Sequence, residues 1–102
     1  MSKLSSHTEV VIIGGGIAGC SIAYHLSEKN IQVTLVERKS LTCGTTWHAA
    51  GLVGQLRATK NLTKMAKYST DLYRKLNDKD DLSAGFVING SVSIAETEGR
   101  MQ

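Results

Sequence analysis

The amino-acid sequence predicts an α/β fold whose first half is a parallel strand–helix–strand unit. The β-branched run EVVII, residues 9–13, is apolar on both faces, as a buried parallel strand should be. Glycines follow at once, and residues 17–30 then carry apolar side chains at helical spacing, with Asn30 as a suitable stop. A second apolar run, IQVTLVE at residues 31–37, completes a unit of about 30 residues, the usual size of a βαβ unit.

The second half is expected to hold a long loop, one helix and strand-like sequence. Residues 38–59 lack periodicity, and so long a loop in a compact domain usually carries function. Residues 61–78 have the i, i+3, i+4, i+7 pattern of an amphipathic helix, whose apolar stripe we expect to face the core. After a polar linker at residues 78–82, residues 85–96 are expected to form a β-hairpin turning at Asn89-Gly90 or one strand broken by a glycine bulge.

Composition and charge narrow the class of protein. With 102 residues, 41% of them hydrophobic and 21% charged, the chain has the make-up of one small globular domain. It has no apolar run of about 18 residues, so no membrane insertion is expected. The net charge of +3 is thinly spread, and its densest part is better explained by a solvated helix face than by a nucleic-acid surface. That basic set is Lys60, Lys64, Lys67, Arg74 and Lys75.

The cysteines and the chain ends add weaker indications. Cys20 and Cys43 lack metal-ligand spacing, so we expect free thiols, no metal site and a reducing compartment. Residues 1–8 are short and polar, unlike a targeting sequence, so we expect a flexible N-terminus and a cytoplasmic location. The last residues, ETEGRMQ, contain no closing element, so we expect residues 9–102 to be the N-terminal portion of a longer chain.

The glycines between the first strand and the helix form the dinucleotide-binding fingerprint G-x-G-x-x-G. Gly14 permits the tight turn, Gly16 lets a pyrophosphate approach the backbone, and Gly19 lets the helix pack against the sheet. The N-terminus of the helix would supply N–H donors to the phosphates. The alternative is a glycine-rich turn that binds nothing.

The order of the elements favours the binding interpretation. Glu37 ends the second strand, where a carboxylate accepts hydrogen bonds from a ribose and would repel the 2′-phosphate of NADP. We therefore expect the N-terminal part of a Rossmann-like, doubly wound nucleotide-binding domain. The fingerprint alone does not separate FAD from NAD.

The loop after the second strand carries the most specific signal. Its sequence LTCGTTWHAAGL, residues 41–52, holds the single tryptophan of the chain beside a histidine. Together with the fingerprint and the Glu37-Arg38 pair, it resembles the FAD-dependent amine oxidoreductases of the D-amino-acid-oxidase superfamily. The likeness is closest to the dimethylglycine and sarcosine dehydrogenase branch, where this loop reads L-T-x-G-[ST]-T-W-H-x-A-G-L. Residues 85–95 also resemble a later family segment, G-F-x-x-x-G-S-[IV]-x-[IL]-A.

The resemblance implies FAD as cofactor. In the family, the histidine of T-W-H carries the flavin covalently through its 8α-methyl carbon; that position is His48, and an unprotonated imidazole is a suitable nucleophile. Spacing alone favours a loop histidine satisfied by backbone hydrogen bonds, and it allows Trp47 to pack in the core or at the flavin edge. The implied cofactor-binding residues are Gly14, Gly16, Ile17, Ala18, Gly19, Glu37, Arg38, Leu41, Thr42, Gly44, Thr45, Thr46, Trp47, His48, Ala49 and Gly51.

The resemblance also implies a reaction at the C–N bond of N-methylated glycines. The methyl group of dimethylglycine or sarcosine would lose a hydride to the flavin, and water would then release formaldehyde. Longer members of the family bind tetrahydrofolate in a C-terminal region that captures the one-carbon unit. The family likeness makes the mitochondrial matrix the alternative location.

Within these residues no catalytic base, substrate ligand or electron acceptor is identifiable. We expect the chain to continue into the start of an α+β substrate domain. We also expect the piece alone to be inactive and to hold FAD poorly, because one βαβ unit leaves the flavin ring uncovered. The alternatives are a non-catalytic regulatory homologue, like the regulatory subunit of pyruvate dehydrogenase phosphatase, or another amine or amino-acid oxidase of the superfamily.

Overall fold

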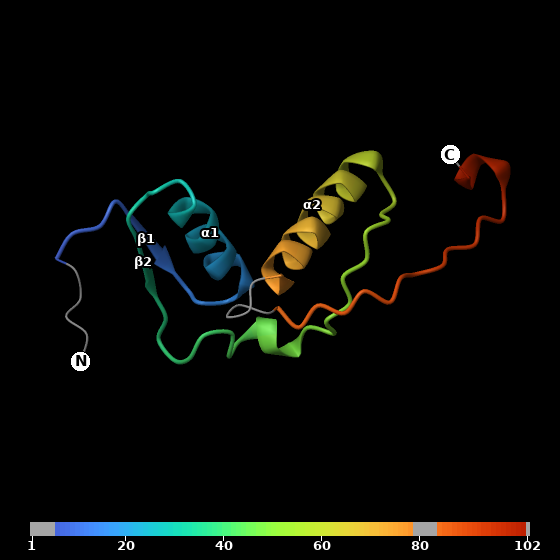
Figure 1. Ribbon diagram of the computed structural model, residues 1–102. Coiled ribbons are helices and arrows are strands. Elements are labelled where there is room, and N and C mark those ends of the chain that lie inside the picture. The colour runs from blue at the N-terminus through green and yellow to red at the C-terminus, as the bar shows by residue number, and fades with distance from the viewer. Residues whose placement is uncertain (1–5, 79–83, 102) are drawn as a thin grey trace. The chain divides into compact units, whose positions relative to one another are not determined.

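The computed structural model describes residues 6–78 and 84–101, and the chain divides into two units at residues 51 and 52. The first unit contains strand β1 (Val10–Ile13), helix α1 (Ile17–Ser27), strand β2 (Val33–Val36) and the 3₁₀ helix η1 (Thr45–His48) (Figure 1). The second contains helix α2 (Lys60–Asn77) and the 3₁₀ helix η2 (Glu98–Arg100). The α/β class predicted from the sequence is confirmed. Neither α-helix of the described chain is long and apolar enough to cross a membrane.

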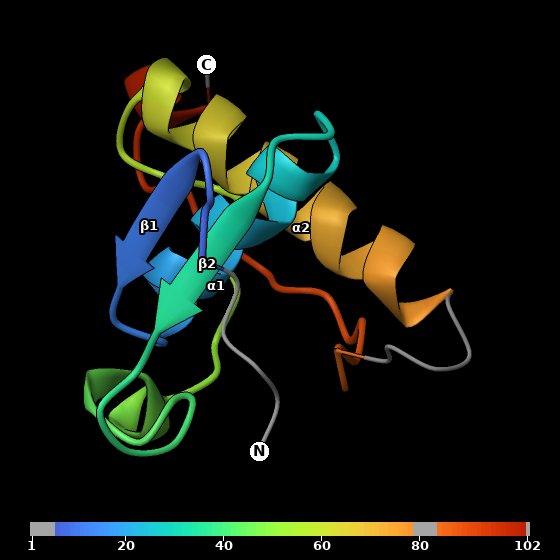
Figure 2. The ribbon, with the colours of Figure 1, turned by 90° about the vertical axis from the view of Figure 1, so that its left-hand side faces the viewer.

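The two strands form a parallel pair, as the βαβ pattern predicts. Their register aligns Val10 with Val33 and Ile13 with Val36. Figure 2 shows the pair side by side with α1 behind it. The N-terminal end of the pair is tied by Thr8, whose hydroxyl donates to the carbonyl of Gln32 at 2.9 Å. Residues 1–5 of the predicted flexible N-terminus lie outside the described part of the chain.

Only one face of the strand pair is covered. Ile12 is buried at 8% exposure, and it faces α1, because its Cγ2 lies 3.3 Å from the Cβ that a side chain at Gly19 would add. On the opposite face Val11 and Ile13 are 58% and 90% exposed. The expectation that β1 is buried on both faces is therefore wrong for the described residues, because a single helix follows the strand and covers one side.

Helix α1 ends where the sequence indicates. Asn30 adopts a left-handed conformation with φ of 58°, which asparagine tolerates better than most residues. The N–H of Ile31 then donates to the carbonyl of Leu26 at 3.1 Å, which satisfies one of the free carbonyls at the helix end. The chain can therefore turn back at once into β2.

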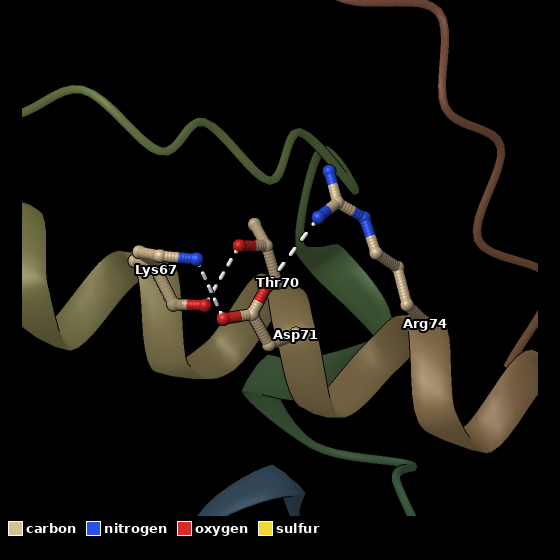
Figure 3. Close-up of polar contacts among 4 residues, drawn as sticks. All are labelled: Lys67, Thr70, Asp71 and Arg74. Atoms are coloured by element: carbon tan, nitrogen blue, oxygen red, sulfur yellow. Dashed lines mark hydrogen bonds and ion pairs between the residues drawn. The ribbon is translucent and has the colours of Figure 1, made fainter.

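Helix α2 is confirmed, and its polar face is solvated. The hydroxyl of Thr59 caps its first turn by accepting the N–H of Leu62 at 3.3 Å. Asp71 pairs with Lys67 at 2.9 Å and with Arg74 at 3.3 Å, and all three side chains are about half exposed (Figure 3). Such exposed pairs contribute little to stability.

The apolar stripe of α2 is covered unevenly. Its first part is exposed, with Leu62 at 49% and Met65 at 68%. Its last part, including Leu72 and Tyr73, is half-buried. The expectation that the whole stripe packs in a core is thus correct only toward the C-terminal end of the helix, where Tyr73 stacks against Phe86 with ring centroids 5.7 Å apart.

Residues 84–101 form no strand, so both the predicted hairpin and the predicted bulged strand are wrong here. The side chain of Asn77 holds the start of this segment, because its amide donates to the carbonyl of Phe86 and accepts the Phe86 N–H at 3.1 Å. Beyond that clamp, Val92 and Ile94 are 94% and 85% exposed. A strand needs a backbone partner, and the described residues offer none beside it. Most of the predicted linker at residues 78–82 lies outside the described residues.

Replacement of Gly19 tests the close approach of α1 to the turn before it. A Cβ at Gly19 would lie 2.0 Å from the carbonyl oxygen of Gly14, and the obstacle is rigid backbone. We expect Gly19→Ala to lower the free energy of unfolding by about 1–3 kcal/mol through this overlap. The loss should appear in urea denaturation followed by circular dichroism, although alanine is intrinsically the better helix former by about 1 kcal/mol.

Gly99→Ala is the matched control for this substitution. Gly99 lies within the 3₁₀ helix η2, whose backbone alanine can adopt, and nothing lies within 4 Å of the Cβ that it would gain. The control should keep the stability of the unmodified chain. A Gly19→Ala variant as stable as the control would contradict the overlap.

Candidate functional site

The glycine turn (residues 14–16) joins β1 to α1 at the carboxyl end of the strand pair. Gly14 has φ of +105°, a conformation in which an L side chain is strained. Its N–H donates to the carbonyl of Val36 at 2.8 Å, so the turn remains tied to β2. The role predicted for Gly14 in making the tight turn agrees with this geometry.

Gly15 is a residue that the sequence pattern missed. It occupies a variable position of G-x-G-x-x-G, yet it is buried, and a Cβ there would lie 2.5 Å from Cδ2 of Leu41 and 3.2 Å from Cβ of Glu37. The signal that could have found it is the run of three glycines, one more than the fingerprint requires at this point. A side chain at Gly15 would have to displace the end of Leu41 and would crowd Glu37, because the next loop packs directly on the turn.

That next loop (residues 37–46), the clasping loop, binds the backbone of the glycine turn at two points and the first residue of α1 at a third. The N–H of Gly15 donates to Oε2 of Glu37 at 2.8 Å. The carbonyl of Gly15 accepts the N–H of Thr42 at 2.9 Å, and Thr42 itself has a positive φ of 64°. The N–H of Ile17 donates to Oγ1 of Thr46 at 3.0 Å. The structure therefore brings together fingerprint and loop residues that lie far apart in the sequence.

Glu37 is held as a carboxylate by backbone donors. The N–H of Gly15 and, as the second cause, the N–H of Lys39 lower the pKa of the Glu37 carboxyl below its ordinary value of 4.5. The Lys39 N–H donates to Oε1 at 3.0 Å. Each carboxylate oxygen has a second lone pair. The side chain can therefore still accept hydrogen bonds from a ribose.

The N-terminus of α1 keeps donors for an anion. The N–H groups of Ala18 and Gly19 have no acceptor within residues 6–78 and 84–101. The Thr46 hydroxyl accepts the Ile17 N–H, so its own hydrogen is available to a further acceptor. Free N–H groups at the positive end of a helix are suited to phosphate. This donor set fits the pyrophosphate of a dinucleotide.

The segment after the clasping loop presents its aromatic and imidazole side chains to solvent. Trp47 and His48 lie in η1, Trp47 is 77% exposed, and His48 is also exposed. In the part of the chain that the structure describes, the His48 imidazole has no hydrogen-bond partner, so the backbone does not satisfy it. Gly51, with φ of +73°, ends the segment, and no atom lies close to the Cβ position of Gly44 or Gly51.

The remaining predicted site residues lie in the clasping loop, in η1 or directly after it. Leu41 packs on Gly15, Thr45 begins η1, and Ala49 donates its N–H to the carbonyl of Thr46 at 3.2 Å. Arg38 directly follows Glu37 and is exposed.

Cys20 and Cys43 are free thiols. The described residues contain no group of three side chains able to hold a metal ion.

The comparisons with known proteins agree with this site. Residues 9–102 match the FAD dependent oxidoreductase family DAO, and the chain belongs to that family. A solved structure of glycine oxidase from Bacillus cereus ATCC 14579 superposes with a TM-score of 0.68 at 32% identity, covering 93% of this chain and 28% of that one. The parallel strand pair thus fits an FAD-binding fold, and the family implies FAD as the cofactor.

Similar curated proteins include enzymes and a regulatory subunit. The chain is 48% identical to 4-methylaminobutanoate oxidase (formaldehyde-forming) of Paenarthrobacter nicotinovorans, covering 96% of this chain and 12% of that one. It is 44% identical to human mitochondrial dimethylglycine dehydrogenase, covering 98% and 12%. It is 39% identical to the mouse mitochondrial pyruvate dehydrogenase phosphatase regulatory subunit, covering 96% and 11%. The chain therefore spans about an eighth of the length of these relatives.

Acidification tests the bond between Glu37 and the glycine turn. A folded-state pKa below 4.5 adds stability that is fully present above pH 4.5 and is lost as the pH falls through the lower folded value. We expect the urea midpoint to fall over this acidic range and Glu37→Gln to remove that part of the pH dependence. Glu98→Gln, in η2, is the control and should keep the unmodified profile. Identical acid profiles for Glu37→Gln and the unmodified chain would contradict the interpretation.

Proposed function

We propose that the complete gene product is an FAD-dependent oxidoreductase that removes a methyl group from the nitrogen of an N-methylated amino acid. The observation that carries the proposal is the binding of residues 37–46 to the glycine turn and to the start of α1. Free N–H donors remain at the N-terminus of α1, and the T-W-H segment begins at Thr46, the last residue of this loop. Two of the relatives carry names for reactions on N-methylated amino acids. We propose dimethylglycine or sarcosine as the substrate.

The residues of this chain would bind the cofactor at two ends. Ala18, Gly19 and the Thr46 hydroxyl would donate to the pyrophosphate, since these donors are free in the described structure. Glu37 would accept hydrogen bonds from the adenosine ribose. When bound, FAD supplies an acceptor for the hydride of a C–H bond next to an amine nitrogen. The substrate iminium left by that loss would be hydrolysed by water to formaldehyde and the demethylated amine.

His48 is proposed to carry the flavin covalently. Its imidazole is exposed and without a partner among the described residues, and the small side chains of Ala49 and Ala50 follow it. An unprotonated ring nitrogen is a nucleophile near neutral pH. A covalent bond there would keep the cofactor in place and withdraw electron density from it, which favours hydride acceptance.

Three further proposals concern the whole protein. Tetrahydrofolate would bind beyond these residues and take up the one-carbon unit. The partners are a small N-methyl amine and an electron acceptor of unassigned identity, with no nucleic acid and no membrane insertion. We propose a cytoplasmic location, with the mitochondrial matrix as the alternative because several relatives are named mitochondrial proteins.

The competing function is a non-catalytic regulatory subunit, which the comparisons do not favour over an oxidoreductase.

The covalent link is tested by acid precipitation of the complete gene product. We expect yellow flavin to remain with the protein and, after proteolysis, to add its mass to the peptide that contains His48. His48→Ala should release all of its flavin on precipitation, while His25→Ala, in α1, should retain it. Flavin released from the unmodified protein would reject the covalent link and leave a non-covalent enzyme.

The reaction is tested by formaldehyde production. We expect the complete gene product to release formaldehyde from dimethylglycine or sarcosine, and 4-methylaminobutanoate belongs in the same assay because of the relative that acts on it. The same amino acids without the N-methyl group should give none. A protein that binds FAD but produces no formaldehyde from any of the three would favour the regulatory alternative.

A further inference from the structure

Among the described residues, the segment that carries His48 (residues 43–51) has one hydrogen bond to the glycine turn or α1. In the described part of the chain, residues 43–51 make hydrogen bonds among themselves or with Ser40, apart from the bond in which Thr46 Oγ1 accepts the Ile17 N–H at 3.0 Å. Thr46 is half-buried, whereas its neighbours Thr45, Trp47 and His48 are exposed. The position of the exposed imidazole relative to α1 therefore depends on this hydroxyl.

The Thr46 hydroxyl acts as the cap of a helix that is distant in the sequence. Gly16, the residue before α1, has no side chain, and the helix has no cap bond from its own N-cap residue. Thr46 provides the missing acceptor from 29 residues further along the chain. The absence of a Cβ at Gly16 leaves room for it, because that atom would lie 3.1 Å from Thr46 Oγ1. The second glycine of the fingerprint thus makes space for a hydroxyl as well as for a phosphate.

This geometry separates two roles of one side chain. The hydroxyl oxygen accepts from Ile17 and fixes η1, while the hydroxyl hydrogen remains available to an anion at the N-terminus of α1. The first role positions His48, which lies two residues further on in the same 3₁₀ helix. The second role would contribute to cofactor affinity alone. The rate of attachment at saturating FAD reports on the first role, because affinity no longer limits it there.

We propose that Thr46 is a positioning residue for covalent attachment of the flavin, acting through its bond to the Ile17 N–H. The inference rests on the proposed function of His48. In the attachment, a bond forms between an imidazole nitrogen and the 8α-methyl carbon. The nitrogen and the carbon each lose one hydrogen, and dioxygen takes up both hydrogens with their electrons and leaves as hydrogen peroxide. The rate requires near-attack geometry, and a displacement of about 1 Å reduces such rates about 10²-fold.

Ile17→Pro removes the donor of this hydrogen bond. Proline lacks the N–H that Thr46 accepts, and it is favoured at the first position of a helix. Gly16 before it has φ of −79° and ψ of −175°, the extended conformation that a residue preceding proline prefers. The proline Cδ takes the place of the amide hydrogen, so it also displaces the Thr46 hydroxyl from the N-terminus of α1. Thr46→Val removes both roles, and Thr46→Ser restores both.

The experiment uses the complete gene product prepared without flavin and then mixed with FAD. Non-covalent binding is followed by the quenching of flavin fluorescence, and covalent attachment by acid-stable flavin against time. At saturating FAD we expect Ile17→Pro to attach the flavin at least about tenfold more slowly than the unmodified protein. Thr46→Val should also attach it slowly, and Thr46→Ser should attach it at close to the unmodified rate.

Thr63→Val is the matched control, since Thr63 Oγ1 accepts the Arg57 N–H at 3.0 Å in the second unit. It should attach flavin at the unmodified rate. Attachment at that rate at saturating FAD by a folded Ile17→Pro or Thr46→Val variant would overturn the role of Thr46. If the unmodified protein acquires no acid-stable flavin while binding FAD, the His48 link fails, and this inference falls with it. If Ile17→Pro fails to fold, the ratio of attachment rates for Thr46→Val and Thr46→Ser at saturating FAD decides.

Discussion

The close approach of α1 to the glycine turn is the constraint on which the first unit depends. The Cα of Gly19 comes so near the carbonyl of Gly14 that no larger side chain fits. This proximity brings the helix onto Ile12, and the N–H groups of Ala18 and Gly19 have no acceptor among the described residues. A parallel strand pair requires a crossover helix on one face, and the missing side chain sets how closely that helix can lie.

The clasping loop adds a second constraint on the same backbone. The Glu37 carboxylate accepts the N–H of Gly15, and the Thr46 hydroxyl accepts the N–H of Ile17. The N–H of Thr42 donates to the carbonyl of Gly15. Gly15 is buried under Leu41 as a result. The turn is thus organised by protein groups before any cofactor binds, and the N–H groups of Ala18 and Gly19 stay free. Preorganised donors of this kind bind an anion with little rearrangement.

Many large apolar side chains of the described residues are exposed, and this affects which sequence inferences succeed. Ile13, Leu52 and Val92 are each at least 89% exposed. Apolar periodicity indicates which face of an element tends to be buried, but burial itself needs a partner surface. The chain spans about an eighth of the length of its curated relatives. An apolar pattern can therefore predict a strand or helix correctly while the apolar face that it predicts to be buried stays exposed.

The sequence by itself determined the order of the first three elements and the place of the glycine turn. Gly14, Gly19 and Asn30 have roles set by local backbone geometry and helix termination, which neighbouring residues reveal. It also indicated the family through the T-W-H segment. Only the tertiary structure decided that Leu41 and Glu37 pack against Gly15, that Thr46 caps α1, and that residues 85–96 are not a strand, because contacts between residues distant in sequence leave no local pattern.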